Sequence, residues 1–163
     1  MKMSDGVEWG IHCCTLLAAL PEGTAMHAAA LAEFHGVSES YLLKHLKALA
    51  KAGVLESLPG PKGGYRLARR PAAIALLDIV EAVEGSEPAF RCTEIRQRGP
   101  GAIEASAYRR PCPINAAMLR ADTAWRSALR EQTLDQLVTA VDRQASARSR
   151  RQSLEWLGSN IRR

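Results

Sequence analysis

The sequence predicts a mainly α-helical fold: a winged helix-turn-helix, that is, helices with a small two-stranded β-hairpin wing, followed by a long C-terminal dimerisation helix. Three observations favour this fold class. Apolar residues recur at helical spacing through residues 5–52, two short β-patterned runs surround a turn rich in Gly and Pro at residues 54–68, and a second apolar stripe follows a long irregular loop. A hairpin directly after a helix-turn-helix is typical of a winged helix.

Length and composition indicate one domain, or one compact domain with an appended element. The chain has 163 residues, and 47% of them are hydrophobic, which is enough to bury a core. No apolar run reaches the roughly 18 to 20 residues that cross a bilayer, and the N-terminus lacks the apolar segment of a signal peptide. We therefore expect a cytoplasmic protein, whose four cysteines are thiols or metal ligands rather than disulfides.

The net charge of +5 is concentrated in two segments. Residues 142–163 hold six arginines against Asp142 and Glu155, and residues 90–111 hold five arginines against Glu94 and Glu104. Basic segments of this kind suit nucleic acid, although a charge run is often only a solvated face.

Three helices are expected first. Residues 5–20 carry an apolar stripe that includes Cys14, and Pro21 ends this helix. A second helix spans residues 25–35 and is closed by Gly36. Ser38 is a natural N-cap for a third helix over residues 40–52, which buries Leu42, Leu43, Leu46 and Leu49. The short connection between the second and third helices fits the tight corner of a helix-turn-helix.

This arrangement predicts DNA binding, because the third helix fits the major groove and the hairpin tip reaches phosphates or the minor groove. His45 is a further residue that can lie near DNA. The alternative is a helical protein with an incidental hairpin. The candidate DNA-contacting residues are Ser38, Ser40, Tyr41, Lys44 and Lys47 on the helix and Lys62, Gly63, Gly64 and Tyr65 at the wing.

The second half of the chain contains a loop and further helices. A helix over residues 74–83 ends the DNA-binding domain, residues 1–85, and a loop over 86–113 contains Cys92 and Cys112. Dimerisation helices are expected over 114–141. The first of them carries a stripe that suits either a dimer seam or packing on its own domain: Ile114, Met118, Ala121, Trp125 and Ala128. Thr133 and Gln136 form a capping box for the last helix.

The final segment, residues 142–163, is expected to be a basic and disordered tail, or one in which Leu154, Trp156 and Leu157 dock as a short turn. At the other end of the chain, Cys13 is expected to be a thiol on the polar side of the first helix, and Cys14 a buried packing thiol.

Four segments in order resemble the IscR/NsrR group of bacterial winged-helix regulators: MKMSDGVEWG, SESYLLKHLKALAKAGVLES, PGPKGGYRLARRP and LLDIVEAVEG. The resemblance covers roughly residues 1–141. It implies a homodimer that binds palindromic DNA and, in many members, an iron–sulfur cluster in the loop before the dimerisation helix.

The cysteine pattern departs from the commoner one in this group, which has three cysteines close together in the loop. Here the loop has two, separated by 19 residues, and the chain has no histidine after His45. Missing ligands must come from nearby carboxylates, from the N-terminal half or from outside the protein. Glu8 and His12 are four residues apart, so both project from one helix face and can hold one metal centre together.

Through VEWGIHCC, PAFRCTEIRQRGP and the dipeptide Cys112–Pro113, the chain most resembles the RsrR-type redox sensors of this group. That resemblance implies a 2Fe–2S cluster, two per dimer, held by Glu8 and His12 of one protomer and by Cys92 and Cys112 of the other. We expect the oxidation state to control operator binding, with Trp9 as a candidate relay to the DNA-reading unit.

Three alternatives remain open. The same two thiolates, imidazole and carboxylate also suit zinc, so a zinc-binding regulator is one alternative, and a metal-free winged-helix regulator is another. A thiol enzyme is disfavoured, because the sequence has no nucleophile motif, no Gly-rich nucleotide loop followed by a helix and no CxxC pair.

Overall fold

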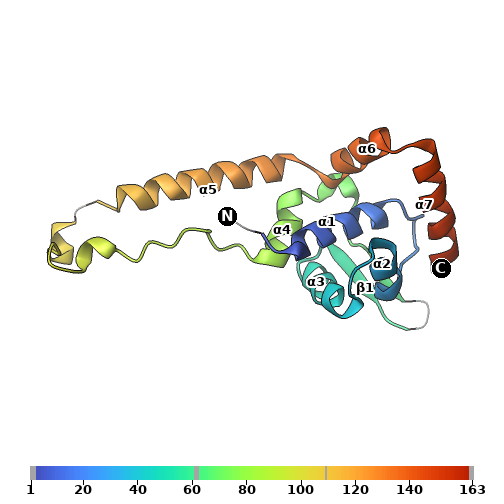
Figure 1. Ribbon diagram of the computed structural model, residues 1–163, viewed down its shortest axis with the longest axis horizontal. Coiled ribbons are helices and arrows are strands. Elements are labelled where there is room, and N and C mark those ends of the chain that lie inside the picture. The colour runs from blue at the N-terminus through green and yellow to red at the C-terminus, as the bar shows by residue number, and fades with distance from the viewer. Residues whose placement is uncertain (1–2, 61–62, 109, 162–163) are drawn as a thin grey trace.

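The computed structural model describes residues 3–60, 63–108 and 110–161, and it consists of a body and an arm (Figure 1). The body contains the first four α-helices, the hairpin and the last two helices, while the arm is a long helix with the preceding loop beside it. The predicted fold class, a helical winged helix-turn-helix with a two-stranded hairpin and C-terminal helices, is confirmed. Within the described residues, no helix has the length and apolar character needed to span a membrane.

The helix-turn-helix consists of α1 (Asp5–Ala18), α2 (Ala28–His35) and α3 (Glu39–Lys51). Gly36 ends α2 with φ 64°, a left-handed conformation that glycine adopts without a steric penalty. The second helix starts three residues later than predicted, because Met26 pairs with Tyr65 instead. The backbone of Met26 donates to the Tyr65 carbonyl at 3.0 Å and accepts from the Tyr65 N–H at 2.8 Å.

The wing is an antiparallel hairpin of β1 (Leu55–Leu58) and β2 (Gly64–Leu67), as the sequence predicts. Leu55 pairs with Leu67, and Glu56 pairs with Arg66, whose Nε lies 2.9 Å from the Glu56 carboxylate. The contacts between Met26 and Tyr65 tie β2, close to the turn of the hairpin, to the segment before α2, so the wing is fixed relative to the helix pair.

The core of the body lies where α1, α3 and the hairpin meet. Leu42, Leu46 and Leu49 of α3 are fully buried, as their spacing predicts, whereas Leu43 is only half-buried. Burying a leucine side chain contributes about 1.5–3 kcal/mol, so these leucines hold α3 firmly on the body. Other fully buried side chains are Cys13, Cys14, Met26, Leu31, Val54, Ile74, Ile79 and Leu134.

Two further helices complete this core, after the short 3-10 turn η1 (Pro71–Ala73): α4 (Leu76–Glu84) and α6 (Leu134–Gln144). The predicted capping box of α6 is confirmed: the Gln136 N–H donates to Thr133 Oγ1 at 3.3 Å, and the Thr133 N–H donates to the Gln136 side chain at 3.0 Å. The segments before α4 and α6 form a bridge between Ala75 and Thr133, which joins the two helix starts.

The arm consists of residues 86–112, with two 3-10 turns, η2 (Ile95–Gln97) and η3 (Ala105–Ala107), and α5 (Pro113–Glu131), which runs back beside them to the body (Figure 1). Arg126 of α5 fixes the base of the arm: it pairs with Glu81 of α4, with Asp122 at 2.7 Å and with the Glu87 carbonyl at 3.1 Å. No residue of α5 is buried in the single chain, although the helix is fully described.

The C-terminal tail forms a helix, α7 (Ala147–Asn160), so the expectation of disorder is wrong for these residues, whereas the expected docking of Trp156 and Leu157 is confirmed, on a helix rather than on a short turn. Ser146 caps the helix by accepting from the Ser149 N–H at 3.1 Å. Leu157 is 4% exposed, and Trp156 packs on Phe34 of α2 with ring centroids 4.9 Å apart. The tail is therefore part of the body, while Leu154 stays 64% exposed.

Candidate metal site and nucleic-acid interface

The recognition helix α3 presents its polar face to solvent. Ser40, Lys44 and Lys47 follow one another at spacings of four and three residues, so they lie on one face of the helix. Their side chains and those of Ser38 and Tyr41 are exposed, and the Tyr41 ring is 45% exposed. The structure thus places all five predicted helix contacts where nucleic acid can reach them.

His45 differs from this group, because it is buried at 5% exposure and does not face solvent. Its ring lies on Gly6 of α1 so closely that a Cβ at that glycine would come within 2.2 Å of it. Burial lowers the pKa of His45, so the ring is mainly neutral at neutral pH. This burial does not agree with a direct contact between His45 and DNA, because the side chain packs from α3 onto α1.

Trp9 of α1 joins the same ring cluster. Its indole meets His45 with centroids 6.3 Å apart and meets Tyr41 at 5.2 Å, both edge to face. Tyr41 in turn lies 5.0 Å from His45. These three rings connect the N-terminal half of α1 with the exposed face of the recognition helix.

Two of the predicted wing residues, Gly63 and Gly64, pack closely on the protein's own backbone, and Lys62 lies outside the described residues. A Cβ at Gly63 would come within 2.1 Å of the Leu58 carbonyl, and one at Gly64, with φ 142°, within 2.5 Å of the Met26 carbonyl. Both glycines therefore permit a close approach of the protein's own backbone. Tyr65 is buried at 7% exposure, which contradicts its predicted place at the DNA-facing tip.

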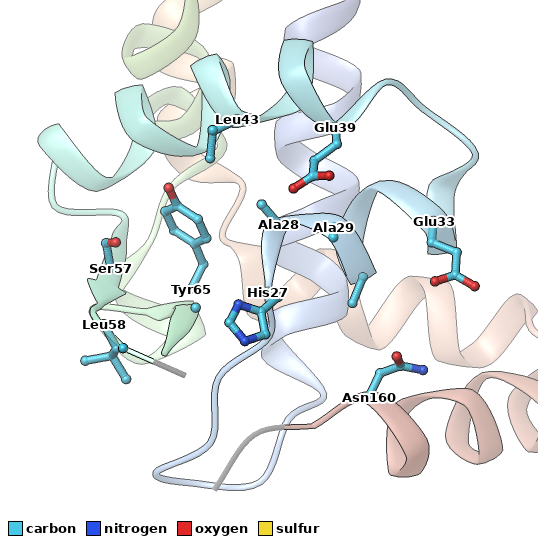
Figure 2. Close-up of a pocket in the computed structure, with 13 residues that line it drawn as sticks. His27, Ala28, Ala29, Glu33, Glu39, Leu43, Ser57, Leu58, Tyr65 and Asn160 are labelled. Carbon is cyan, nitrogen blue, oxygen red and sulfur yellow. The ribbon is translucent and has the colours of Figure 1, made fainter. Parts of the chain in front are cut away.

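A cavity of about 550 Å³ lies between the helix-turn-helix, the wing and the end of α7 (Figure 2). The ring of Tyr65 projects toward Leu43, His27 stands on the other side, and Asn160 approaches from α7. None of the four predicted metal ligands lines this cavity, so it is separate from the candidate metal site.

The two loop cysteines come together at the tip of the arm. The Sγ atoms of Cys92 and Cys112 and a carboxylate oxygen of Glu94 all lie within 4.8 Å of one another, a spacing that suits a shared metal ion. Cys112 is 6% exposed, and Cys92 and Glu94 are half-buried. Cys92 and Cys112 were both predicted as ligands, and their meeting across the loop is the main geometric result for this site.

The electrostatics of the arm tip favour the thiolate form of Cys112. This residue is the N-cap of α5, where the backbone N–H groups of Asn115 and then Ile114 lower its pKa, and Arg96 acts in the same direction. At Cys92 the Glu94 N–H also lowers the pKa, but burial together with the Glu94 carboxylate outweighs it, and the net pKa is raised. The pKa of Cys112 therefore lies below the usual value for a thiol, and that of Cys92 lies above it.

Glu94 and Arg96 are functional candidates that the sequence analysis did not single out. Glu94 accepts from Arg96 Nη2 at 2.7 Å and from the Cys92 thiol at 3.5 Å, and the bond to Arg96 lowers its pKa. The guanidinium of Arg96 lies 4.5 Å over the Tyr108 ring, and the Tyr108 hydroxyl donates to the Arg96 carbonyl. The spacing Cys92–Thr93–Glu94 was the sequence signal for this carboxylate.

Glu8 and His12 lie on the exposed side of α1, one helical turn apart as predicted. Neither belongs to the cysteine cluster of the same chain, and the tip of the arm stands well away from α1 in Figure 1. The ring centroids of His12 and of His35 in α2 lie 5.7 Å apart. The pKa of His35 is lowered, mainly by burial and to a smaller extent by the nearby His12. One chain therefore brings together two of the four predicted ligands.

The adjacent Cys13 and Cys14 are both fully buried in the core. Cys14 is the packing thiol that the sequence predicts, but the placement of Cys13 on the polar side is wrong. Burial raises the pKa of Cys13 to about 12 and raises that of Cys14 further, so both stay protonated at neutral pH. Protonated thiols inside an apolar core are poor ligands and poor nucleophiles.

Comparison with known proteins gives a family match over most of the chain. Residues 3–140 match the Rrf2 family, described as iron-dependent transcriptional regulators. Among individual proteins, YwgB of Bacillus subtilis (strain 168), assigned to the HTH-type transcriptional regulators, is 32% identical over 141 residues, which is 86% of this chain and 86% of YwgB. The match to the family ends before α7.

Solved structures show the same architecture. CymR (YrzC), the global cysteine regulator of B. subtilis, aligns over 86% of this chain and 98% of its own, with a TM-score of 0.62 and 25% identity. IscR of T. potens aligns over 90% of this chain and 93% of its own, with a TM-score of 0.66 and 23% identity, and shows likeness of fold alone.

Proposed function

The chain belongs to the Rrf2 family of transcriptional regulators, and we propose that it is a homodimeric redox sensor in which a 2Fe–2S cluster controls binding to a palindromic DNA operator. Membership of a regulator family sets aside the thiol-enzyme alternative. A DNA-binding role is also what supports a cytoplasmic location. The finer statements, namely the cluster, its ligands, the dimer and the redox control, are argued below from this chain's own residues.

DNA recognition is assigned to α3 in the major groove. Lys44 and Lys47 supply charge for phosphates, and Ser38, Ser40 and Tyr41 supply hydrogen-bonding groups near the start of the helix, where recognition helices read base edges. The wing then lies beside the adjacent groove or its phosphates. The backbone hydrogen bonds between Met26 and Tyr65 hold the wing in a fixed position beside the helix pair that includes α3.

The dimer is supported by the surface of α5. Ile114, Met118 and Leu119 are 65%, 42% and 39% exposed on a helix that stands out from the body. Ile114 and Met118 belong to the predicted stripe, and their exposure favours the dimer seam for that end of α5, whereas Trp125, nearer the body, is half-buried. A second copy that covers this surface would bury it, as the apolar seam of a helical dimer does.

The single observation that carries the cluster proposal is the meeting of Cys92 and Cys112 at the arm tip, away from Glu8 and His12 of the same chain. Two soft thiolates suit iron–sulfur chemistry but leave a four-ligand site half complete. An arm that reaches beyond its own body can bring this pair to α1 of a partner. Glu8 and His12 of that partner then supply the carboxylate and the imidazole, which is the set that the resemblance to RsrR-type sensors implies.

A bound 2Fe–2S cluster would supply a one-electron change of charge at this place, and a neutral imidazole in its ligand set favours a higher reduction potential. The protein's own residues can pass such a change to DNA. Trp9 is next to Glu8 in α1 and contacts Tyr41 on the exposed face of α3. A shift of α1 therefore moves a ring that touches the recognition helix, which supports the assignment of Trp9 as a relay.

The test is a measurement of cofactor content and DNA binding on the same anaerobic sample. We expect a red-brown protein with about two irons and two sulfides per chain. We expect different operator affinities for the oxidised and reduced forms at one salt concentration. His12→Ala should lose the cluster, whereas the control His27→Ala should keep it. A colourless protein with zinc supports the zinc-binding alternative, one with no metal supports the metal-free alternative, and equal affinities of the two redox forms contradict the redox control.

A further inference from the structure

Glu94 adds a third donor to the two thiols at the arm tip. Cys92 and Glu94 come from the outgoing segment of the arm, and Cys112 comes from the start of α5, yet their ligand atoms lie within 4.8 Å of one another. All three belong to one chain. The arm tip therefore has a metal-binding donor set that needs no residue of α1 and no second protomer.

The spacing of these donors agrees with a tetrahedral cation. The Cys92 Sγ and the Glu94 Oε1 are 3.5 Å apart. In a tetrahedral zinc site with Zn–S near 2.3 Å and Zn–O near 2.0 Å, the sulfur and oxygen lie about 3.5 Å from each other. Side chains in this position need little movement to bind one ion together.

The environment of Glu94 is that of a supported ligand. Its Oε2 accepts from Arg96 Nη2 at 2.7 Å and from Nε at 3.0 Å, so the Oε1 is left to face the Cys92 sulfur. Arg96 is itself held by stacking over Tyr108 at 4.5 Å and by the hydroxyl of that tyrosine, which donates to its carbonyl. Metal-binding carboxylates are commonly oriented by such hydrogen-bond partners.

We propose that each protomer, when it holds no cluster, binds one divalent cation of the zinc type through Cys92, Glu94 and Cys112, with water at the fourth position. Two thiolates and one carboxylate are an ordinary donor set for zinc, and the shielded position of Cys112 limits exchange with solvent. The cation shares both thiols with the cluster proposed above, so the two occupants exclude each other. The proposal does not require that cluster to exist.

The experiment uses the full-length protein, stripped of any cluster, with Co²⁺ as an optical probe and Zn²⁺ as competitor. We expect one Co²⁺ per chain with thiolate-to-metal absorption and the strong visible bands of tetrahedral cobalt, which Zn²⁺ abolishes. Glu94→Gln should weaken Zn²⁺ binding by tenfold or more, and Arg96→Met by about tenfold through loss of its support. Glu104→Gln is the matched control: this glutamate lies in the same loop, outside the donor cluster, and should leave the affinity unchanged.

Two results would overturn the inference. One is unchanged Zn²⁺ affinity in Glu94→Gln. The other is loss of the ion in a Glu8→Ala/His12→Ala variant, which would show that α1 supplies ligands. Failure of the cluster proposal is separate, because Glu94→Gln keeps all four proposed cluster ligands and should still assemble a cluster. A wild-type protein that binds Zn²⁺ through Glu94 but never a cluster would contradict only the proposed function.

Discussion

The indole of Trp9 meets the ring of Tyr41 edge-on, with centroids 5.2 Å apart and planes at 83°. Trp9 lies in α1 beside Glu8, and Tyr41 lies on the exposed side of α3. Trp9, the residue next to the proposed ligand Glu8, therefore contacts directly a side chain of α3 that is proposed to bind DNA.

Removal of this contact should uncouple the two faces. Trp9→Ala should keep the cluster but bring the DNA affinities of the oxidised and reduced forms closer by about 2- to 10-fold, since an aromatic pair of this kind contributes roughly 0.5–1.5 kcal/mol. Trp9→Phe keeps a ring at the position and should retain more of the difference. The measurement is fluorescence anisotropy with operator DNA in both redox states. An undiminished difference in Trp9→Ala would exclude the relay.

The basic residues of α3 should contribute through phosphates. Lys44→Ala and Lys47→Ala should each weaken binding to operator and unrelated DNA alike, and each should reduce the slope of log affinity against log salt concentration by about 1. Lys51→Ala, at the far end of the same helix, serves as the control and should leave the slope nearly unchanged. Salt titrations of the three variants distinguish these outcomes, and equal slopes for all three would place the groove contacts elsewhere.

The side of α7 that packs on the body should contribute to the free energy of unfolding, and its exposed side should not. Leu157→Ala, at 4% exposure, should lower the free energy of unfolding by about 2–4 kcal/mol, because it leaves a cavity between α7 and the body. Leu154→Ala, on the same helix at 64% exposure, should change it by less than about 0.5 kcal/mol. Urea denaturation of the two variants makes the comparison. Similar values for both would mean that α7 is not docked.

Local patterns in the sequence were sufficient for most of the fold. The leucines of α3, Gly36 after α2 and the capping box of Thr133 each act within a few residues, so their spacing predicts the element directly. The start of α2 and the helical form of the tail were missed, because both depend on contacts between segments far apart in the sequence. Met26 is held extended by Tyr65, and Trp156 is held by Phe34, and neither partner is near in sequence.

The residues of the candidate site also include some that the sequence predicted and some that it missed. The resemblance to RsrR-type sensors implied Cys92 and Cys112 as ligands, and the fold of the arm brings them together. From the sequence, His45 and Tyr65 were expected to be accessible, but both are buried. The His45 ring fills the space beside Gly6 of α1, and the apolar spacing of α3 does not reveal such a contact with another helix. Glu94 was missed because its neighbour Cys112 approaches only through the return of the arm.

The most direct test of the account is a mixed dimer. A Glu8→Ala/His12→Ala protomer and a Cys92→Ala/Cys112→Ala protomer, each unable to assemble a site alone, are combined with different affinity tags and purified as the heterodimer. Ligation across protomers predicts one complete site, hence about two irons and two sulfides per heterodimer and the visible spectrum of the wild-type cluster, with neither homodimer coloured. Verified heterodimers without iron or colour would contradict the shared site.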